Sequence, residues 1–260
     1  MPAPRVLILR APGTNCDLET AYAFELAGAV TERIHINQLL ETPDTARHFQ
    51  VLCLPGGFSY GDDVAAGRIL ANQFRHHLAA TLQEFKQAGN LILGVCNGFQ
   101  ILIKSGVLLA DTPAGPPATL TWSESGRYLD RWVDVIVDGS RCVFLQGIER
   151  MYLPIAHAEG KFVTRDRQTL AQLAASGQLP LRYGTEPTTS LDQPWPFPVN
   201  PNGAWGNVAG VCDETGRVFG LMPHPERHLD PTNHPHWTRL PAREHGDGLQ
   251  LFQNAVRYFA

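Results

Sequence analysis

Short apolar runs alternate with longer amphipathic stretches through the first half of the chain. Each run is bounded by Gly, Pro or polar residues and predicts a buried β-strand, whereas apolar residues three or four positions apart predict helices. The expected elements are strands at Arg5–Leu9, Thr31–Ile36, Val51–Leu54 and Leu91–Val95, and helices at Asp17–Ala27, Ile69–Ala88 and Phe99–Lys104. Their β-α-β order predicts a doubly wound α/β fold, in which helices flank both faces of a mostly parallel sheet.

The second half has a less regular pattern. The expected elements are strands at Arg131–Val137 and Met151–Ile155, a helix at Asp166–Ser176, a hairpin of Val208–Cys212 and Val218–Met222, and a closing helix at Leu249–Phe259. Residues 186–203 are rich in Pro and Asn, which predicts an ordered loop rather than a linker between domains. We therefore expect residues 1–260 to form a single domain.

The loop after the strand Leu91–Val95 holds a G-x-C-x-G motif at residues 94–98, with Cys96 at its centre. Between an apolar strand and an apolar helix, this motif predicts a nucleophile elbow, whose glycines let the strand and the helix pack closely. The start of a helix also carries partial positive charge, which favours a thiolate over a thiol. We therefore predict that Cys96 is a catalytic nucleophile.

A thiol nucleophile needs a base and an acid, and histidine serves as both near neutral pH. Of the ten histidines, His224 is the best placed, because it follows the apolar run Val218–Met222 and so lies at a strand end. In extended backbone, residues two apart project to the same side, so Glu226 can reach the ring of His224 and hold its tautomer. The residues thus predict a Cys96–His224–Glu226 triad.

Attack of a thiolate on an amide carbonyl creates an oxyanion, which needs preorganised donors. The backbone N–H of Asn97, at the expected start of a helix, is one candidate donor. The N–H of Gly57 is the second, because the Pro55–Phe58 loop lies at the same sheet edge and glycine lets a backbone approach a ligand closely. We predict that Gly57 and Asn97 form the oxyanion hole.

Composition narrows the class of protein. Apolar residues make up 43% of the chain, the formal net charge is −4, and the basic residues form no stripe, so we expect no nucleic-acid partner. No apolar run approaches the length of a membrane span, and the run Val6–Leu9 is too short for a signal-peptide core. We therefore expect a cytoplasmic protein that does not contact a membrane.

The five cysteines are odd in number, scattered and without C-x-x-C spacing, which argues against a disulfide framework and a structural zinc site. We interpret Cys53, Cys142 and Cys212 as buried structural residues. Cys16 lies in a loop at the functional edge of the sheet, where we expect a structural or minor role.

Histidines crowd near the C-terminus and raise a catalytic metal as an alternative. They are His224, His228, His234, His236 and His245. Their spacing matches no zinc motif, and the neighbouring prolines predict a loop rather than a rigid helix. The chain also lacks the G-x-x-x-x-G-K-[ST] motif that cradles nucleotide phosphates. We expect neither a metal nor a bound cofactor in this chain.

Six segments together carry the pattern of a known family. They are Gly13–Asp17, Leu54–Asp62, Gly94–Gln100, Pro154–Gly160, Asn200–Gly203 and Met222–Arg227. These segments resemble class I glutamine amidotransferases and, more narrowly, the family of glutaminase subunits of phosphoribosylformylglycinamidine synthase. The resemblance implies a Cys–His–Glu triad that strips ammonia from glutamine, in the fourth step of de novo purine biosynthesis.

The same resemblance implies partners. In this family a separate synthetase subunit uses ATP and Mg to activate an amide oxygen of formylglycinamide ribonucleotide, and ammonia reaches it through a tunnel between the subunits. A small third subunit bridges the two. The resemblance also implies that Gln100 and His157 lie near the glutamine or near the synthetase interface.

Two other interpretations remain open from the sequence. The first is a different cysteine hydrolase of the same architecture, such as a peptidase or a chaperone-like protein, although Asn97 stands where some of these carry histidine. A thioester trapped from glutamine but not from peptides would distinguish it. The second is a non-catalytic module that binds glutamine or a partner, which the intact triad argues against. Selective alkylation of Cys96 by a glutamine analogue would distinguish that one.

Overall fold

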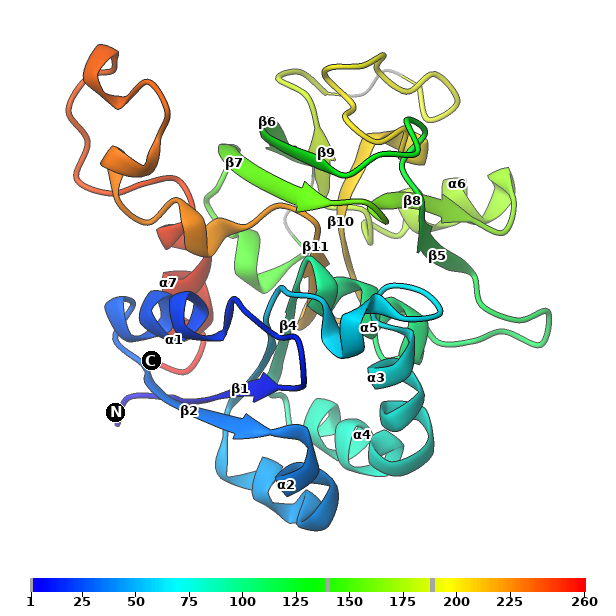
Figure 1. The fold of residues 1–260 in the computed structure, drawn as a ribbon, viewed down its shortest axis with the longest axis vertical. Helices are drawn as coiled ribbons and strands as arrows, with labels where there is room; N and C mark the ends of the chain where they lie inside the picture. Colours follow the sequence, from blue (N-terminus) through cyan, green and yellow to red (C-terminus); the bar gives the residue numbers. More distant parts are fainter. Residues whose placement is uncertain (1, 139–140, 188–189) are drawn as a thin grey trace.

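A computed structural model describes residues 2–138, 141–187 and 190–260 (Figure 1). Within these residues, nine strands form one sheet in the order β2-β1-β3-β4-β11-β10-β9-β6-β7. The first five run parallel to one another. They are β2 (Val30–His35), β1 (Arg5–Arg10), β3 (Val51–Leu54), β4 (Leu91–Val95) and β11 (Val218–Leu221). β3, β4 and β11 are buried along their whole length, which explains their uninterrupted apolar sequences.

The other half of the sheet is antiparallel. It contains β10 (Val208–Cys212), β9 (Leu181–Tyr183), β6 (Leu129–Val137) and β7 (Arg150–His157). A separate two-stranded sheet pairs β5 (Ala118–Thr121) with β8 (Lys161–Thr164). The sequence did not predict β5, β8 or β9, because β9 has only three residues, and β5 and β8 lack the uninterrupted apolar run that marks β3.

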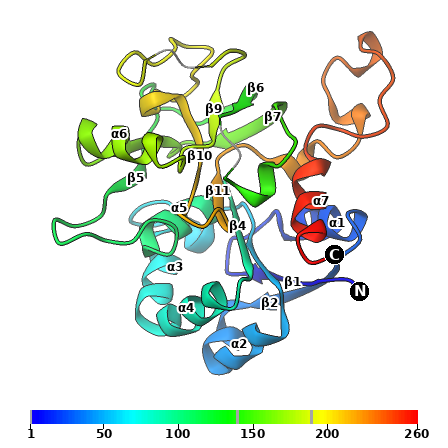
Figure 2. The same cartoon turned by 180° about the vertical axis from the view of Figure 1, so that it is seen from behind.

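Helices cover both faces of the parallel half (Figures 1 and 2). On one face lie α1 (Asp17–Leu26) and α7 (Leu249–Arg257), which pack together through Phe24 and Phe252 with ring centroids 5.0 Å apart. On the other lie α3 (Arg68–Gln73), α4 (Ala79–Gln87) and α5 (Asn97–Ser105), with α5 packed directly on β3, β4 and β11. The doubly wound α/β prediction is therefore confirmed.

Local differences from the predicted elements have physical causes. The long helix expected at Ile69–Ala88 contains a π-helical turn at Phe74–Leu78, so α3 and α4 are not one regular α-helix. The side chain of Arg75, within this turn, donates to the carbonyl of Lys104 at 2.8 Å. The short helix α2 (Ile36–Glu41) was not predicted, and α6 (Arg167–Ala175) agrees with its prediction to within a residue or two.

The described part of the loop 186–203 has neither helix nor strand, as expected; residues 188 and 189 lie outside the described residues. Buried apolar residues from both halves of the chain form one cluster that runs from Val6 to Ala255. This common core supports the proposal that the chain is a single domain. Within the described residues, no helix has the length and apolar character needed to cross a membrane.

Candidate active site

Cys96 occupies the sharp turn between β4 and α5. Its φ of 51° and ψ of −104° lie in a region that side chains rarely adopt, and its backbone N–H donates to the carbonyl of Leu221 on β11 at 2.8 Å. The flanking glycines are needed for packing, because a Cβ at Gly98 would overlap the carbonyl oxygen of Leu54. The turn therefore has the features of a nucleophile elbow, and its strain is held by the neighbouring strands.

His224 follows β11 and is fixed by its backbone N–H, which donates to the carbonyl of Pro154 at 2.9 Å. Its Nδ1 lies 2.6 Å from Oε1 of Glu226, and both side chains are buried. The expected contact between them is present, but the assumption of extended backbone was wrong. Pro225–Arg227 is a 3-10 turn, and this turn brings the carboxylate to the ring.

Nε2 of His224 has no hydrogen-bond partner among the described residues, and Cys96 is close enough to the ring to act on its pKa, so the nucleophile and the predicted base lie near each other. Burial disfavours the charged imidazolium, but the charges of Glu226 and Cys96 outweigh burial and raise the pKa of His224 well above its ordinary value. The arrangement therefore stabilises a protonated histidine beside a sulfur nucleophile, which is the proton donor that departure of an amine requires.

Gly57 and Asn97 lie on two loops that are tied to each other. The Gly57 loop pairs with the loop after β1, where the N–H of Phe58 donates to the carbonyl of Gly13 at 2.9 Å. The side chain of Asn97 accepts from the N–H of Ser59 at 3.1 Å. Because Asn97 is the first residue of α5, its own N–H has no partner within the helix. The assignment of the oxyanion hole to Gly57 and Asn97 stays a prediction.

Gln100 links α5 to the loop after β7. Its Nε2 donates to the carbonyl of Glu159 at 2.6 Å, and its Oε1 accepts from Nδ2 of Asn97 at 2.9 Å. Both ends of the amide are thus engaged by protein groups. This placement favours a role in holding the Asn97 turn, while the predicted contact with glutamine stays a prediction.

His157 ends β7 and is almost fully buried. Neither ring nitrogen has a hydrogen-bond partner among the described residues. Burial, together with the charge of His224, lowers the pKa of His157 to about 3, so the ring is neutral at physiological pH. An unpartnered neutral imidazole beside the triad can donate a hydrogen bond to a small polar molecule or accept one from it.

Cys16 lies closer to the predicted triad than the structural or minor role expected from the sequence implies. Its sulfur interacts with the ring of His224 and accepts from Nη2 of Arg227 at 3.2 Å. Burial raises the pKa of Cys16 to about 11, although the nearby ring of His224 acts in the opposite direction. The available signal was the Gly13–Asp17 loop, which follows β1 at the sheet edge that carries Cys96.

Metal binding has one geometric candidate within the described ranges. The possible ligand atoms of Cys16, His224 and Glu226 lie within 4.8 Å of one another. We interpret this cluster as part of the triad, because its imidazole and carboxylate already bind each other. Of the C-terminal histidines, His228 bonds to the carbonyl of Tyr152 at 2.7 Å, and His234 packs against Tyr152 with ring centroids 4.9 Å apart. The absence of a metal stays a prediction.

Comparison with known proteins gives consistent matches over the whole chain. The family model of the CobB/CobQ-like glutamine amidotransferase domain matches residues 3–259. A protein of Dehalococcoides mccartyi named phosphoribosylformylglycinamidine synthase subunit PurQ is 47% identical over 255 residues, covering 98% of this chain and 97% of that protein. A protein of the same name from Methanococcus maripaludis is 40% identical over 268 residues, covering 98% and 97%. A chain in the solved structure of PurLQS from Thermotoga maritima superposes with a TM-score of 0.74 and 31% identity, covering 99% of this chain and 100% of that one.

Proposed function

This chain belongs to the CobB/CobQ-like glutamine amidotransferase family and, within it, to the family of phosphoribosylformylglycinamidine synthase PurQ subunits, and we propose that it hydrolyses glutamine to supply that synthase with ammonia. The chain is thus an enzyme subunit of purine biosynthesis. The observation that carries the proposal is the buried Nδ1–Oε1 pair of His224 and Glu226 beside the strained Cys96. Family membership favours this function over a peptidase or a non-catalytic module.

In the proposed reaction, the thiolate of Cys96 attacks the side-chain carboxamide carbon of glutamine. The N–H groups of Gly57 and Asn97 bind the oxyanion. Loss of one such donor typically lowers the turnover number about 10²- to 10³-fold. His224, oriented by Glu226, protonates the nitrogen as the C–N bond breaks, and ammonia leaves a γ-glutamyl thioester on Cys96. His224 then takes a proton from water, which attacks the thioester, and glutamate departs as the C–S bond breaks.

We further propose that the ammonia passes to a synthetase subunit that holds ATP and Mg, and that a small third subunit bridges the two chains. The similar Thermotoga chain belongs to a structure of PurLQS, which supports such partners. The lack of a phosphate-cradling G-x-x-x-x-G-K-[ST] motif in this chain supports ATP binding on the partner. The neutral ring of His157 supports a role near glutamine or the departing ammonia. The cytoplasmic location stays a prediction.

The first experiment replaces the nucleophile. We expect Cys96→Ala, assayed with its partner subunits, to lose glutamine hydrolysis by more than about 10³-fold, because no thioester can form. Added ammonium chloride should restore product formation by the same complex, because the synthetase half is intact. Cys142→Ala, which removes a buried thiol outside the site, should keep its activity.

Two results would contradict the proposal. Full glutamine hydrolysis by Cys96→Ala would remove Cys96 as the nucleophile. A folded Cys96→Ala complex that ammonium chloride cannot rescue would contradict the transfer of ammonia to the partner.

A further inference from the structure

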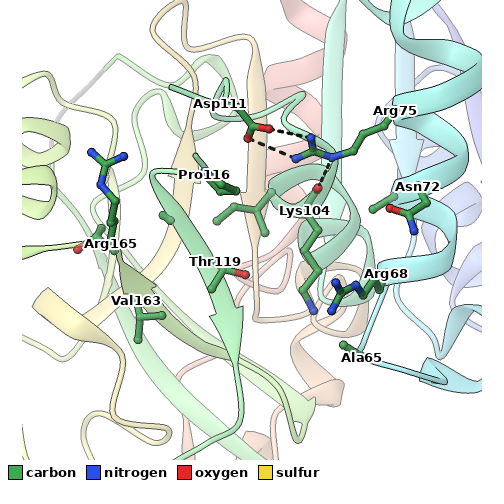
Figure 3. Close-up of a pocket in the computed structure, with 14 residues that line it drawn as sticks. Ala65, Arg68, Asn72, Arg75, Lys104, Asp111, Pro116, Thr119, Val163 and Arg165 are labelled. Atoms are coloured by element: carbon green, nitrogen blue, oxygen red, sulfur yellow. Dashed lines mark hydrogen bonds and ion pairs between the residues drawn. The ribbon is translucent and has the colours of Figure 1, made fainter. Parts of the chain in front are cut away.

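A cavity lies outside the candidate catalytic centre, between the helices α3 and α5 and the small β5–β8 sheet (Figure 3). Its volume is about 640 Å³, and none of the predicted triad lines it. Cavities of roughly 300–1,000 Å³ are typical of sites for small molecules. Its walls include the apolar side chains of Ile103, Pro116 and Val163.

Four cationic side chains and a single acidic side chain line this cavity. The cations are Arg68, Arg75, Lys104 and Arg165, and the acid is Asp111. Arg75 is already neutralised, because its guanidinium makes two bonds to Asp111, at 2.7 and 3.3 Å. Arg165 is partly compensated by Asp166 at 3.4 Å. Lys104 pairs with Glu159 at 3.3 Å, so Arg68 is the lining cation that has no anionic partner within the described residues.

The side chain of Arg68 has no hydrogen bond or ion pair to any residue in the described part of the chain. It lies close enough to Lys104 for their charges to oppose each other, and Figure 3 shows both side chains pointing toward the same end of the cavity. Lys104 itself is held by the carbonyl of Ala66 at 2.6 Å and by Glu159 at 3.3 Å. Arg68 is therefore the cation that remains available to an incoming anion, and an anion bound there would also offset its repulsion with Lys104.

We propose that this cavity binds a phosphorylated small molecule, with its phosphate between Arg68 and Lys104 and its organic part against Ile103, Pro116 and Val163. Guanidinium and ammonium groups are the usual phosphate donors in proteins, and charge-assisted bonds of this kind are stronger than neutral ones. The apolar walls distinguish the site from one for a bare anion. The limited volume favours a small molecule over a protein segment.

A chain of hydrogen bonds connects this cavity with the catalytic turn. Lys104 binds Glu159, whose carbonyl accepts from Gln100, and Gln100 in turn accepts from the side chain of Asn97. Lys104 and Asn97 also lie on the same helix, α5. A phosphate that draws Lys104 from Glu159 is therefore expected to change the rate of glutamine hydrolysis. This last effect, unlike the binding itself, rests on the proposed function.

The test is a titration of the full chain at constant ionic strength with inorganic phosphate, ribose 5-phosphate and adenosine monophosphate, followed by calorimetry and thermal unfolding. We expect saturable binding, tighter for a phosphate that carries an organic group than for inorganic phosphate. Arg68→Ala should weaken binding at least about tenfold, since it removes one charge-assisted contact. The variant should fold normally, because the side chain of Arg68 is exposed and unpaired within the described ranges. Arg239→Ala, at an exposed arginine elsewhere, should bind like the wild type.

Three outcomes would overturn the inference. They are no saturable binding of any of these probes, equal binding by Arg68→Ala and wild type, or equal affinity for inorganic phosphate and both organic phosphates. The Cys96→Ala variant separates this inference from the proposed function. It should bind the probes like the wild type, whether or not the wild type hydrolyses glutamine.

Discussion

At the scale of single residues, the sulfur of Cys16 lies between two charged groups of the candidate site. It accepts an N–H from Arg227 at 3.2 Å and interacts with the ring of His224. Arg227 also donates to Glu19 at 2.9 Å, and its charge acts on Glu226. Cys16 therefore engages one arm of a guanidinium that would otherwise be free to pair with the carboxylate of Glu226.

We expect Cys16→Ala to release this arm of Arg227. Closer pairing of Arg227 with Glu226 would weaken the support of Glu226 for protonated His224 and lower the pKa of His224. The proton of His224 is then lost at lower pH, so the alkaline limb of the kcat/KM profile for glutamine should move to lower pH. We expect kcat to fall roughly 3- to 30-fold, as for one lost charged hydrogen bond, with KM unchanged.

The groups that act on His224 are Cys16, Cys96, Tyr128, His157 and Glu226. Cys142→Ala is the matched control, since it removes a buried thiol that is not among them. An alkaline limb at the same pH in Cys16→Ala and wild type would show that Cys16 only fills space.

His157 predicts how stability depends on pH. Its pKa is about 3 in the folded chain, while an unfolded histidine has a pKa of about 6.5. Between these values the unfolded state binds more protons, so His157 makes the free energy of unfolding fall as pH decreases, by up to about 1.4 kcal/mol per pH unit. In His157→Gln, urea unfolding between pH 6.5 and 4.5 should show a shallower dependence on pH. A slope identical to that of the wild type would contradict the assignment of a neutral His157.

At the scale of elements, α5 connects the Cys96 turn with the cavity that we propose binds a phosphorylated molecule. Its first turn lies directly against β3, because Gly98 has no side chain and approaches the carbonyl of Leu54. Its last turn carries Lys104 into the cavity wall. A shift of this helix would therefore alter both the Cys96 turn and the cavity.

We expect Gly98→Ala to force α5 away from β3, since the added methyl group would overlap the Leu54 carbonyl. The free energy of unfolding should fall by about 2 kcal/mol or more, as in other overpacked cores, and glutamine hydrolysis should be lost. Urea unfolding with an activity assay measures both. Gly28→Ala provides the comparison, because a Cβ there meets no atom within 4 Å and costs about 1–2 kcal/mol through its positive φ alone.

The sequence predicted best the elements that are buried along their whole length and so show an uninterrupted apolar run, such as β3 and β4. β9, with three residues, and the π-helical turn at Phe74–Leu78 leave no comparable pattern. The loops of the site could be predicted because parallel strands bring their carboxyl ends to one edge. The contact of Cys16 with Arg227 could not, because it joins residues 211 positions apart and depends on how the turn after β11 lies against α1.

At the scale of the whole molecule, a strand of the antiparallel half of the sheet contacts the site that the parallel half forms. β7 is the last strand in the sheet order, yet its Pro154 carbonyl accepts from the N–H of His224, and the thiol of Cys96 donates to the carbonyl of Ala156 at 3.6 Å. Figure 1 shows β6 and β7 lying across the ends of the parallel strands. The candidate site is therefore enclosed between the two halves of one sheet, an environment that strengthens its charge interactions.

Because Cys96 is only 5% exposed under this covering strand, its sulfur is nearly sealed from solvent. The segment 158–160, which follows β7, is held in place because its carbonyls accept hydrogen bonds from the side chains of Ser123, Gln100 and Asn202. We therefore expect glutamine to reach the sulfur only when this segment moves, because the arrangement leaves little of Cys96 accessible. Gated entry of this kind would make arrival at the sulfur slower than diffusion allows, and it would restrict the water near the thioester to what the closed site admits.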